Sequence, residues 1–382
     1  MTREFLVVGT RKKKMEKPNP DDLVTVAGQL LAENKMSGAF AYYKKAANLY
    51  LEKGSYFKVF EVFKIMSYLY KEMGKLGEMI QLVLDTARKL EDFKVFDVAA
   101  RMYENAGTMS YDLADYENAS AYYQNASDLY LSIYEEDKSE EMRKLSGILL
   151  IKSAEATYRI ASKKDKSESL MLEGIFRICA LAEKIPDLET RLIMSFNRAL
   201  FTEARAAASN LAKSFKDANE KILITKEFNV ELLSTNVKAR ILHYQAEYLF
   251  LEYLLSRKMD GEIKAAKKAN LVIDLLFEAL RLMRAIIMME YDREDIDRYC
   301  FDGMLYSITN ALIGAKPEPD GFLEGIRGDV IGVINQNIYY KIMITIIGLG
   351  LKQAKGALFG ANLGKLERVK SSMMKLIYAD AL

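Results

Sequence analysis

The strongest constraint on the fold of this chain is an internal repeat in its first half. The segment Ala41–Leu51 (AYYKKAANLYL) returns 80 residues later as Ala121–Leu131 (AYYQNASDLYL), with its tyrosines, key alanines and leucines unchanged. Between the two copies, helical patterns at about 56–73, 76–90 and 94–109 begin about 20 residues apart, so a helix pair takes about 40 residues. This rhythm predicts an all-α fold in which antiparallel helix pairs form a solenoid.

The residue types within the repeat agree with helix pairs. Small residues allow two helices to approach closely, and large residues fill the space beside them. We expect the close approaches at Ala46, Ala99, Ala100 and Ala126, and the filling side chains at Tyr43, Tyr50, Tyr123 and Tyr130. Glycine tolerates the left-handed conformation in which many helices end, and this predicts helix ends at Gly54, Gly74 and Gly107.

Length and composition set the domain organisation. A chain of 382 residues exceeds the usual size of a single core, and 5 prolines with no tryptophan favour long helices. We predict a flexible basic arm at 1–20, a repeat region at 21–162 and a C-terminal all-helical region at 163–382, with a break near 315–321. The first helix is expected after an N-cap at Asp21 or Asp22, and 187–215 is expected to form one long helix.

The charge pattern suggests a protein partner rather than nucleic acid. The formal net charge is only +2, so no overall field recruits nucleic acid. Basic residues recur through the repeats and predict a surface for an acidic protein or peptide; those singled out are Lys44, Lys45, Lys58, Lys64, Lys94 and Arg101. The alternative is an ordinary solvated face, because glutamates such as Glu61 and Glu91 are interleaved with them.

No residue pattern predicts a catalytic, metal or cofactor site, and we therefore expect a protein that is not an enzyme. The single histidine, His243, is one helical turn from Glu247, and we interpret the two as an i, i+4 pair on a helix face. Phosphate-binding loops, dinucleotide-binding glycine motifs and nucleophile elbows are absent from the sequence. The two cysteines, Cys179 and Cys300, are expected to be buried reduced thiols, which points to the cytoplasm.

Membrane insertion is not predicted. The first ten residues do not resemble a signal peptide, and the longest apolar run, 342–351, is short of the roughly 20 residues that span a bilayer. A Gly-x-x-x-Gly series at 356–364 permits close helix packing, either within the chain or in a homodimer through the C-terminal helices. Peripheral contact of an amphipathic helix with a membrane remains an alternative.

The repeat sequence resembles a known family. The segments 115–130 and 43–50, the latter followed by Lys53-Gly54, are similar to the TPR-like repeats of the soluble NSF attachment protein (SNAP) family, over about residues 37–160. The resemblance implies a curved helical sheet that binds a coiled-coil bundle through a basic face. It also implies contact with a hexameric ATPase through an acidic, leucine-containing C-terminus. This chain ends Tyr378-Ala-Asp-Ala-Leu382, with too few such residues to carry over the ATPase contact.

Two functional hypotheses follow. The first is a non-catalytic cytoplasmic adaptor that binds a helical or peptide partner, such as a helical bundle, on a concave repeat surface. The alternative is a ligand-sensing regulator with a small-molecule pocket within residues 170–382. A helical enzyme would instead require a cluster of strongly perturbed acids or bases in such a cavity.

Overall fold

The computed structural model describes residues 18–160, 162–222, 231–289, 291–316 and 321–354. Most of the predicted basic arm, the centre of the predicted break near 315–321 and the Gly-x-x-x-Gly series at 356–364 lie outside these ranges. The chain divides into two compact units, Met1–Leu129 and Tyr130–Leu382. The domain border predicted at residue 162 falls between two helices of the second unit.

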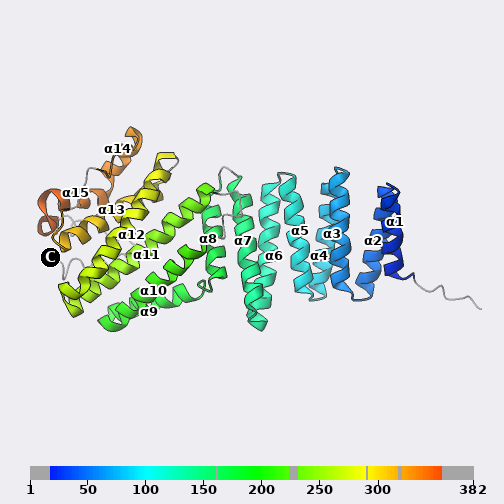
Figure 1. Ribbon diagram of the computed structural model, residues 1–382, viewed down its shortest axis with the longest axis horizontal. Coiled ribbons are helices and arrows are strands. Elements are labelled where there is room, and N and C mark those ends of the chain that lie inside the picture. Colours follow the sequence, from blue (N-terminus) through cyan, green and yellow to red (C-terminus); the bar gives the residue numbers. More distant parts are fainter. Residues whose placement is uncertain (1–17, 161, 223–230, 290, 317–320, 355–382) are drawn as a thin grey trace, which may run out of the picture. The chain divides into compact units, whose positions relative to one another are not determined.

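The first unit is a run of helices with a strict 20-residue period (Figure 1). From α2 to α6 each helix begins 20 positions after the one before it, whereas α2 begins 16 positions after the start of α1, and α6 contains the border between the units. Their bounds are α1 Pro20–Ala32, α2 Met36–Glu52, α3 Tyr56–Glu72, α4 Leu76–Asp92, α5 Phe96–Asp112 and α6 Tyr116–Asp137. The all-helical repeat predicted from the sequence is confirmed.

The N-terminus of α1 differs from the prediction. Its N-cap is Asn19, whose side chain accepts a hydrogen bond from the N–H of Asp21, and Pro20 occupies the first turn. Proline is well suited to that position, because the first amide groups of a helix have no intrahelical partner. The two aspartates therefore lie in the first turn rather than at the cap, where their charge favours the helix dipole.

The turns between these helices repeat with the same period. One residue in each turn has a positive φ, between 58° and 72°: Asn34, Gly54, Gly74, Lys94 and Ala114. The backbone N–H groups of this residue and of the next one donate to carbonyls of the last helical turn, as those of Lys94 and Val95 do at 2.8 Å. This is the Schellman arrangement. The helix ends predicted at Gly54 and Gly74 are confirmed, and three further turns use residues that are not glycine.

Gly107 does not end a helix, contrary to the prediction. It lies inside α5 and is buried, and a Cβ atom added there would be 2.8 Å from two ring carbons of Tyr123. The residue is small because another helix packs against its backbone. Glycine in a sequence marks a helix end or a close approach, and here packing decides between them.

The predicted core of the repeats is confirmed. The alanines at 46, 99, 100 and 126 are fully buried, and the tyrosines at 43, 50, 123 and 130 are buried as well. Helices α3 and α5 lie side by side one 40-residue unit apart. The Asn105 amide donates to the Ser67 hydroxyl at 2.9 Å, and Lys71 is paired with Asp112. Both pairs join positions about one unit apart, as parallel neighbours in a stack of helix pairs require.

The second unit contains helices of unequal length, from 9 residues in α14 to 30 in α11 (Figure 1). Their bounds are α7 Glu140–Tyr158, α8 Lys164–Ile178, α9 Lys184–Asn197, α10 Phe201–Lys221, α11 Glu231–Asp260, α12 Glu262–Met289, α13 Arg293–Leu312, α14 Gly328–Gln336 and α15 Ile338–Leu349. The single helix predicted at 187–215 is wrong. It is two helices, α9 and α10, separated by a turn in which Ala199 has a φ of 57°.

No described helix is by itself both long and apolar enough to cross a bilayer, although α14 and α15, bent by 82° at their junction, reach that length and composition together.

The left-handed turn at Lys94 offers a test of the repeat geometry. We expect Lys94→Gly to raise the free energy of unfolding by about 0.5–1 kcal/mol, because glycine adopts a positive φ without the steric cost of a Cβ. Urea denaturation followed by circular dichroism measures the change. Lys89→Gly, at an exposed position inside α4, is the matched control and should cost about 1 kcal/mol. Destabilisation by both substitutions would contradict the turn geometry.

Candidate functional site

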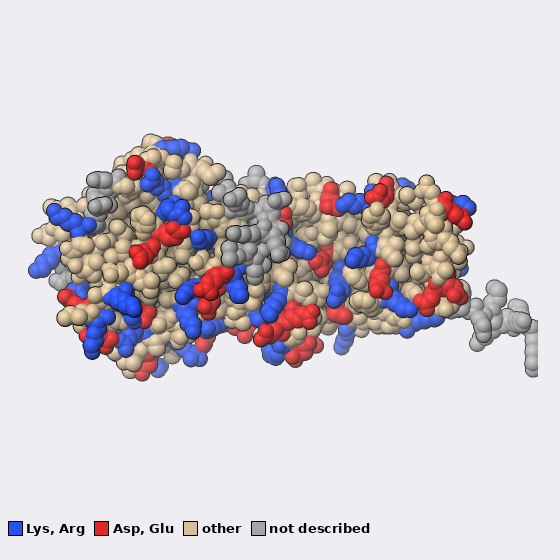
Figure 2. Space-filling model, viewed as in Figure 1, with Lys and Arg blue, Asp and Glu red and all other residues tan. Residues whose placement is uncertain are grey.

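The six basic residues singled out in the sequence are distributed over several helices. Lys44 and Lys45 lie on α2, Lys58 and Lys64 on α3, Lys94 in the turn after α4, and Arg101 on α5. The first five are exposed and Arg101 is half-buried. Lysine and arginine are interspersed with aspartate and glutamate on the face shown in Figure 2. That face carries no continuous basic stripe.

Two of these residues already interact with neighbouring side chains, so less of their charge is available to a binding partner. Lys58 pairs with Asp21 at 2.8 Å and also lies 5.2 Å from the ring centroid of Tyr50. Arg101 lies 5.9 Å from the ring centroid of Phe60 on the neighbouring helix α3. Its guanidinium therefore packs partly against the repeat itself. These two residues take part in packing between repeats as well as carrying charge.

Helix α3 presents an exposed row of apolar and charged side chains, whose apolar members were not predicted from the sequence as part of a binding surface. We call the row Phe57, Glu61, Lys64, Ile65 and Tyr68 the α3 stripe. Its members recur at the spacing of one helix face, and Phe57 and Tyr68 are 55% and 64% exposed. A row of large apolar side chains left in water is typical of an interaction surface. The pattern is visible in the sequence once the buried face of α3 is known.

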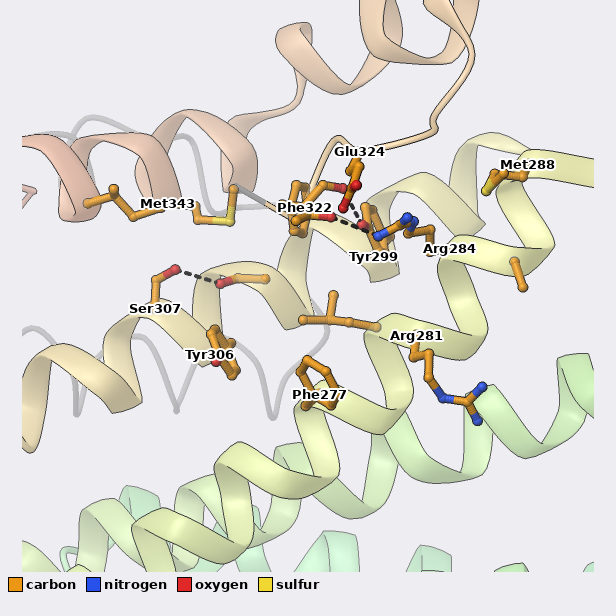
Figure 3. Close-up of a pocket in the computed structure, with 15 residues that line it drawn as sticks. Phe277, Arg281, Arg284, Met288, Tyr299, Tyr306, Ser307, Phe322, Glu324 and Met343 are labelled. Carbon is orange, nitrogen blue, oxygen red and sulfur yellow. Dashed lines mark hydrogen bonds between the residues drawn. The ribbon is translucent and has the colours of Figure 1, made fainter. Parts of the chain in front are cut away.

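The second unit contains a pocket of about 580 Å³ between α12, α13, α15 and the segment 321–324 (Figure 3). Most of its wall is apolar. The apolar and aromatic lining includes Phe277, Leu280, Met288, Tyr299, Tyr306, Phe322, Met343 and Ile347. The volume is within the range of roughly 300–1,000 Å³ that is usual for small-molecule sites.

One wall of the pocket is built around Gly303 on α13. A Cβ atom there would be 2.4 Å from the ring of Phe322 and 2.9 Å from the sulfur of Met343. Phe322 stacks on Tyr299 with ring centroids 4.3 Å apart, and the Tyr299 hydroxyl donates to the Phe322 carbonyl at 2.5 Å. The glycine lets the segment 321–324 and α15 approach α13, and the stack fixes Phe322 against the wall.

The polar groups of the pocket are few. Arg284 on α12 donates from Nη1 to the Gly321 carbonyl at 2.9 Å, and the Ser307 hydroxyl donates to the Gly303 carbonyl at 3.0 Å. Arg281 makes two hydrogen bonds of 2.9 Å to Glu278, which lowers the pKa of that carboxyl. Figure 3 shows Arg284 directed toward the segment that carries Phe322 and Glu324.

His243 lies in the core beneath α13 and does not line the pocket. Its Nε2 is 2.9 Å from Glu247, as the i, i+4 interpretation requires, but its Nδ1 is also 2.7 Å from Asp302 on α13. All three side chains are buried, and the ring is fully enclosed. Burial favours the neutral ring, but the two carboxylates outweigh burial and raise the pKa of His243 to about 9. The cluster is a buried ion network without access for a substrate.

The cysteines are reduced, and their surroundings differ. Cys300 is buried and Cys179 is half-buried, and both are free thiols. Burial raises the pKa of both thiols, so the thiolate that would act as a nucleophile is disfavoured. In the part of the chain that the structure describes, no three His, Cys, Asp or Glu side chains are grouped to hold a metal ion.

Comparison with known proteins gives no family assignment. No family model matches the chain, and no curated protein matches it in sequence. Several solved structures match, and one of them is described as a circular tandem repeat protein with novel repeat topology and enhanced subunit contact surfaces. It is 13% identical over 94% of this chain and 88% of that chain, with a TM-score of 0.24. A TM-score of 0.24 is too low to show a shared fold. The helical-repeat architecture is established by the helices of this chain.

Proposed function

We propose that this protein is a non-catalytic cytoplasmic adaptor whose first unit binds an amphipathic helical segment of a partner protein. The observation that carries the proposal is the α3 stripe. Its apolar members, Phe57, Ile65 and Tyr68, would pack on the apolar face of the partner helix. Lys64 within the stripe would pair with acidic residues on that helix. Because Glu61 also belongs to the stripe, a partner helix with an acidic and a basic residue beside its apolar face fits this surface best.

The sequence resemblance to the SNAP family supports the proposal, because it implies a TPR-like repeat that binds a helical bundle. The Tyr and Ala pattern behind the resemblance is the one that forms the repeat core. That pattern supports the prediction of a repeat fold more strongly than the prediction of a particular partner, since repeat scaffolds of one architecture serve many roles. The partner therefore has to be tested through the exposed residues.

The test is affinity capture from lysate of the source with the wild-type chain and two variants. We expect a stoichiometric protein on the wild type, released as salt rises, and at least a tenfold loss of capture with Phe57→Ala/Tyr68→Ala. Leu113→Ala is the matched control, because Leu113 is an exposed apolar residue of the same unit outside the stripe. Capture that is equal for all three proteins would contradict the proposal.

A second function, ligand sensing, is supported by the pocket of the second unit. We propose that a small molecule held between α12, α13 and α15 stabilises that unit. The supporting observation is a 580 Å³ cavity with apolar walls and few polar groups. This proposal is independent of the adaptor proposal, because the α3 stripe and the pocket belong to different units.

A further inference from the structure

We infer that the pocket between α12, α13 and α15 takes an amphipathic anion, a molecule with an unbranched apolar body and one carboxylate. This inference rests on the proposed ligand-sensing function and adds the chemical class of the ligand. It is carried by Arg284, an arginine without a carboxylate partner among the described residues, in a largely apolar lining. The pocket is partly open to solvent and Arg284 is half-exposed, so a ligand can leave its charged end near water.

The apolar part of the pocket fits a flexible hydrocarbon. Its lining comes from one face each of three helices, at spacings of three and four residues along α12, along α13 and along α15. Met288 and Met343 stand on opposite walls, and the unbranched methionine side chain adapts to ligands of irregular shape. Each CH₂ group buried in such a site strengthens binding about fourfold.

The charged end is assigned to Arg284. Its one hydrogen bond among the described residues is the 2.9 Å contact from Nη1 to the Gly321 carbonyl, and no carboxylate of those residues forms an ion pair with it. Its neighbour on the same helix face, Arg281, is already held by Glu278 through two hydrogen bonds. Arg284 therefore keeps donors for an anion, and a guanidinium binds a carboxylate through two parallel hydrogen bonds.

The remaining polar groups of the lining do not favour a cation or a strongly polar ligand. The Ser307 hydroxyl donates its hydrogen bond to the Gly303 carbonyl, and the Tyr299 hydroxyl donates to the Phe322 carbonyl, so neither proton is available to a ligand. Glu324 also lines the pocket, but it is exposed, so water screens its charge. One anionic group on a largely apolar body is the ligand chemistry that these partners match.

The test is titration calorimetry of the full chain with dodecanoate and with dodecanol, each below the concentration at which it aggregates. We expect dodecanoate to bind the wild type at least tenfold more tightly than dodecanol. Arg284→Gln should remove that preference while leaving dodecanol binding unchanged. Arg281→Gln, the matched control on the same face of α12, should change dodecanoate binding by less than about threefold.

A pocket-filling variant separates failure of the inference from failure of the ligand-sensing proposal. Ala285→Trp places a large side chain in the pocket from an exposed position of α12 and should abolish binding of both compounds. Equal binding of both compounds, lost in Ala285→Trp and unaffected by Arg284→Gln, would overturn the anion inference and leave ligand sensing intact. If neither compound binds, or if binding survives Ala285→Trp, both the inference and the sensing proposal fail for this pocket.

Discussion

His243→Leu is expected to lower the free energy of unfolding by about 3–5 kcal/mol, the usual cost of removing one partner from a buried ion cluster. The imidazolium lies between Asp302 and Glu247, at 2.7 Å and 2.9 Å, and the ring is fully buried. Leucine keeps most of the volume but leaves two carboxylates in the core without the cation. Urea denaturation followed by circular dichroism measures the loss.

The dependence of stability on pH provides a second test of the charge on His243 in the same cluster. The pKa of His243 is raised from 6.5 to about 9 in the folded chain, so the charged ring stabilises the fold fully below pH 6.5. That contribution is lost as the pH rises from about 6.5 to about 9. The wild type should therefore lose stability over this window, and His243→Leu should not show that part of the loss.

Two further variants control this prediction. Arg191→Leu breaks an exposed i, i+4 pair with Asp187 and should cost less than about 1 kcal/mol. Adding Asp302→Asn and Glu247→Gln to His243→Leu removes the two buried charges and should recover part of the lost stability. A parallel pH dependence in wild type and His243→Leu, or no recovery in the triple variant, would show that the ring is neutral in the fold.

Gly147→Ala is expected to destabilise the second unit by about 1–3 kcal/mol or more, because α7 and α8 touch through their backbones at this point. A Cβ atom on Gly147 would lie 2.6 Å from the Gly174 carbonyl oxygen and 2.6 Å from a side-chain carbon of Ile178. In the reverse direction, a Cβ atom added to Gly174 would lie 2.7 Å from the Gly147 carbonyl oxygen. A backbone atom cannot relieve the clash by changing rotamer as a side chain can, so α7 and α8 must move apart. Thermal denaturation should show a lower Tm.

Gly332→Ala is the matched control for this prediction. Gly332 lies inside α14, is exposed, and has nothing within 4 Å of an added Cβ. Alanine there should stabilise the helix by up to about 1 kcal/mol through its higher helix propensity. Substitutions with equal effects at the two glycines would mean that α7 and α8 are not in contact at this crossing.

The boundaries that the sequence predicted correctly are those with strong local signals. Helices α3 and α4 begin and end within about two residues of the predicted bounds, and glycines at 54 and 74 mark the turns on either side of α3. The break between α9 and α10 was missed because its turn carries neither glycine nor proline. Ala199 adopts a positive φ there, a strain that packing of the flanking helices supports.

The candidate surfaces were predicted less well than the fold. The sequence singled out basic residues, but it did not show that Lys58 is paired with Asp21 or that Arg101 packs on Phe60. The α3 stripe becomes recognisable only once the buried face of α3 is known. The apolar pocket residues of α12, such as Phe277 and Met288, could have been noticed as an apolar face in addition to the one that packs into the core.

By itself the sequence determined the all-helical class, the 20-residue rhythm and the small and large residues of the repeat core, because these depend on interactions between residues close in the chain. Only the tertiary structure decided the pocket, the cluster around His243 and the crossing at Gly147 and Gly174. Each of these joins residues that lie tens of positions apart, and their side chains or backbones meet only after separate helices have packed. The spacing of residues along the sequence does not predict such tertiary contacts, whereas it does predict the period of a helix and the length of a repeat.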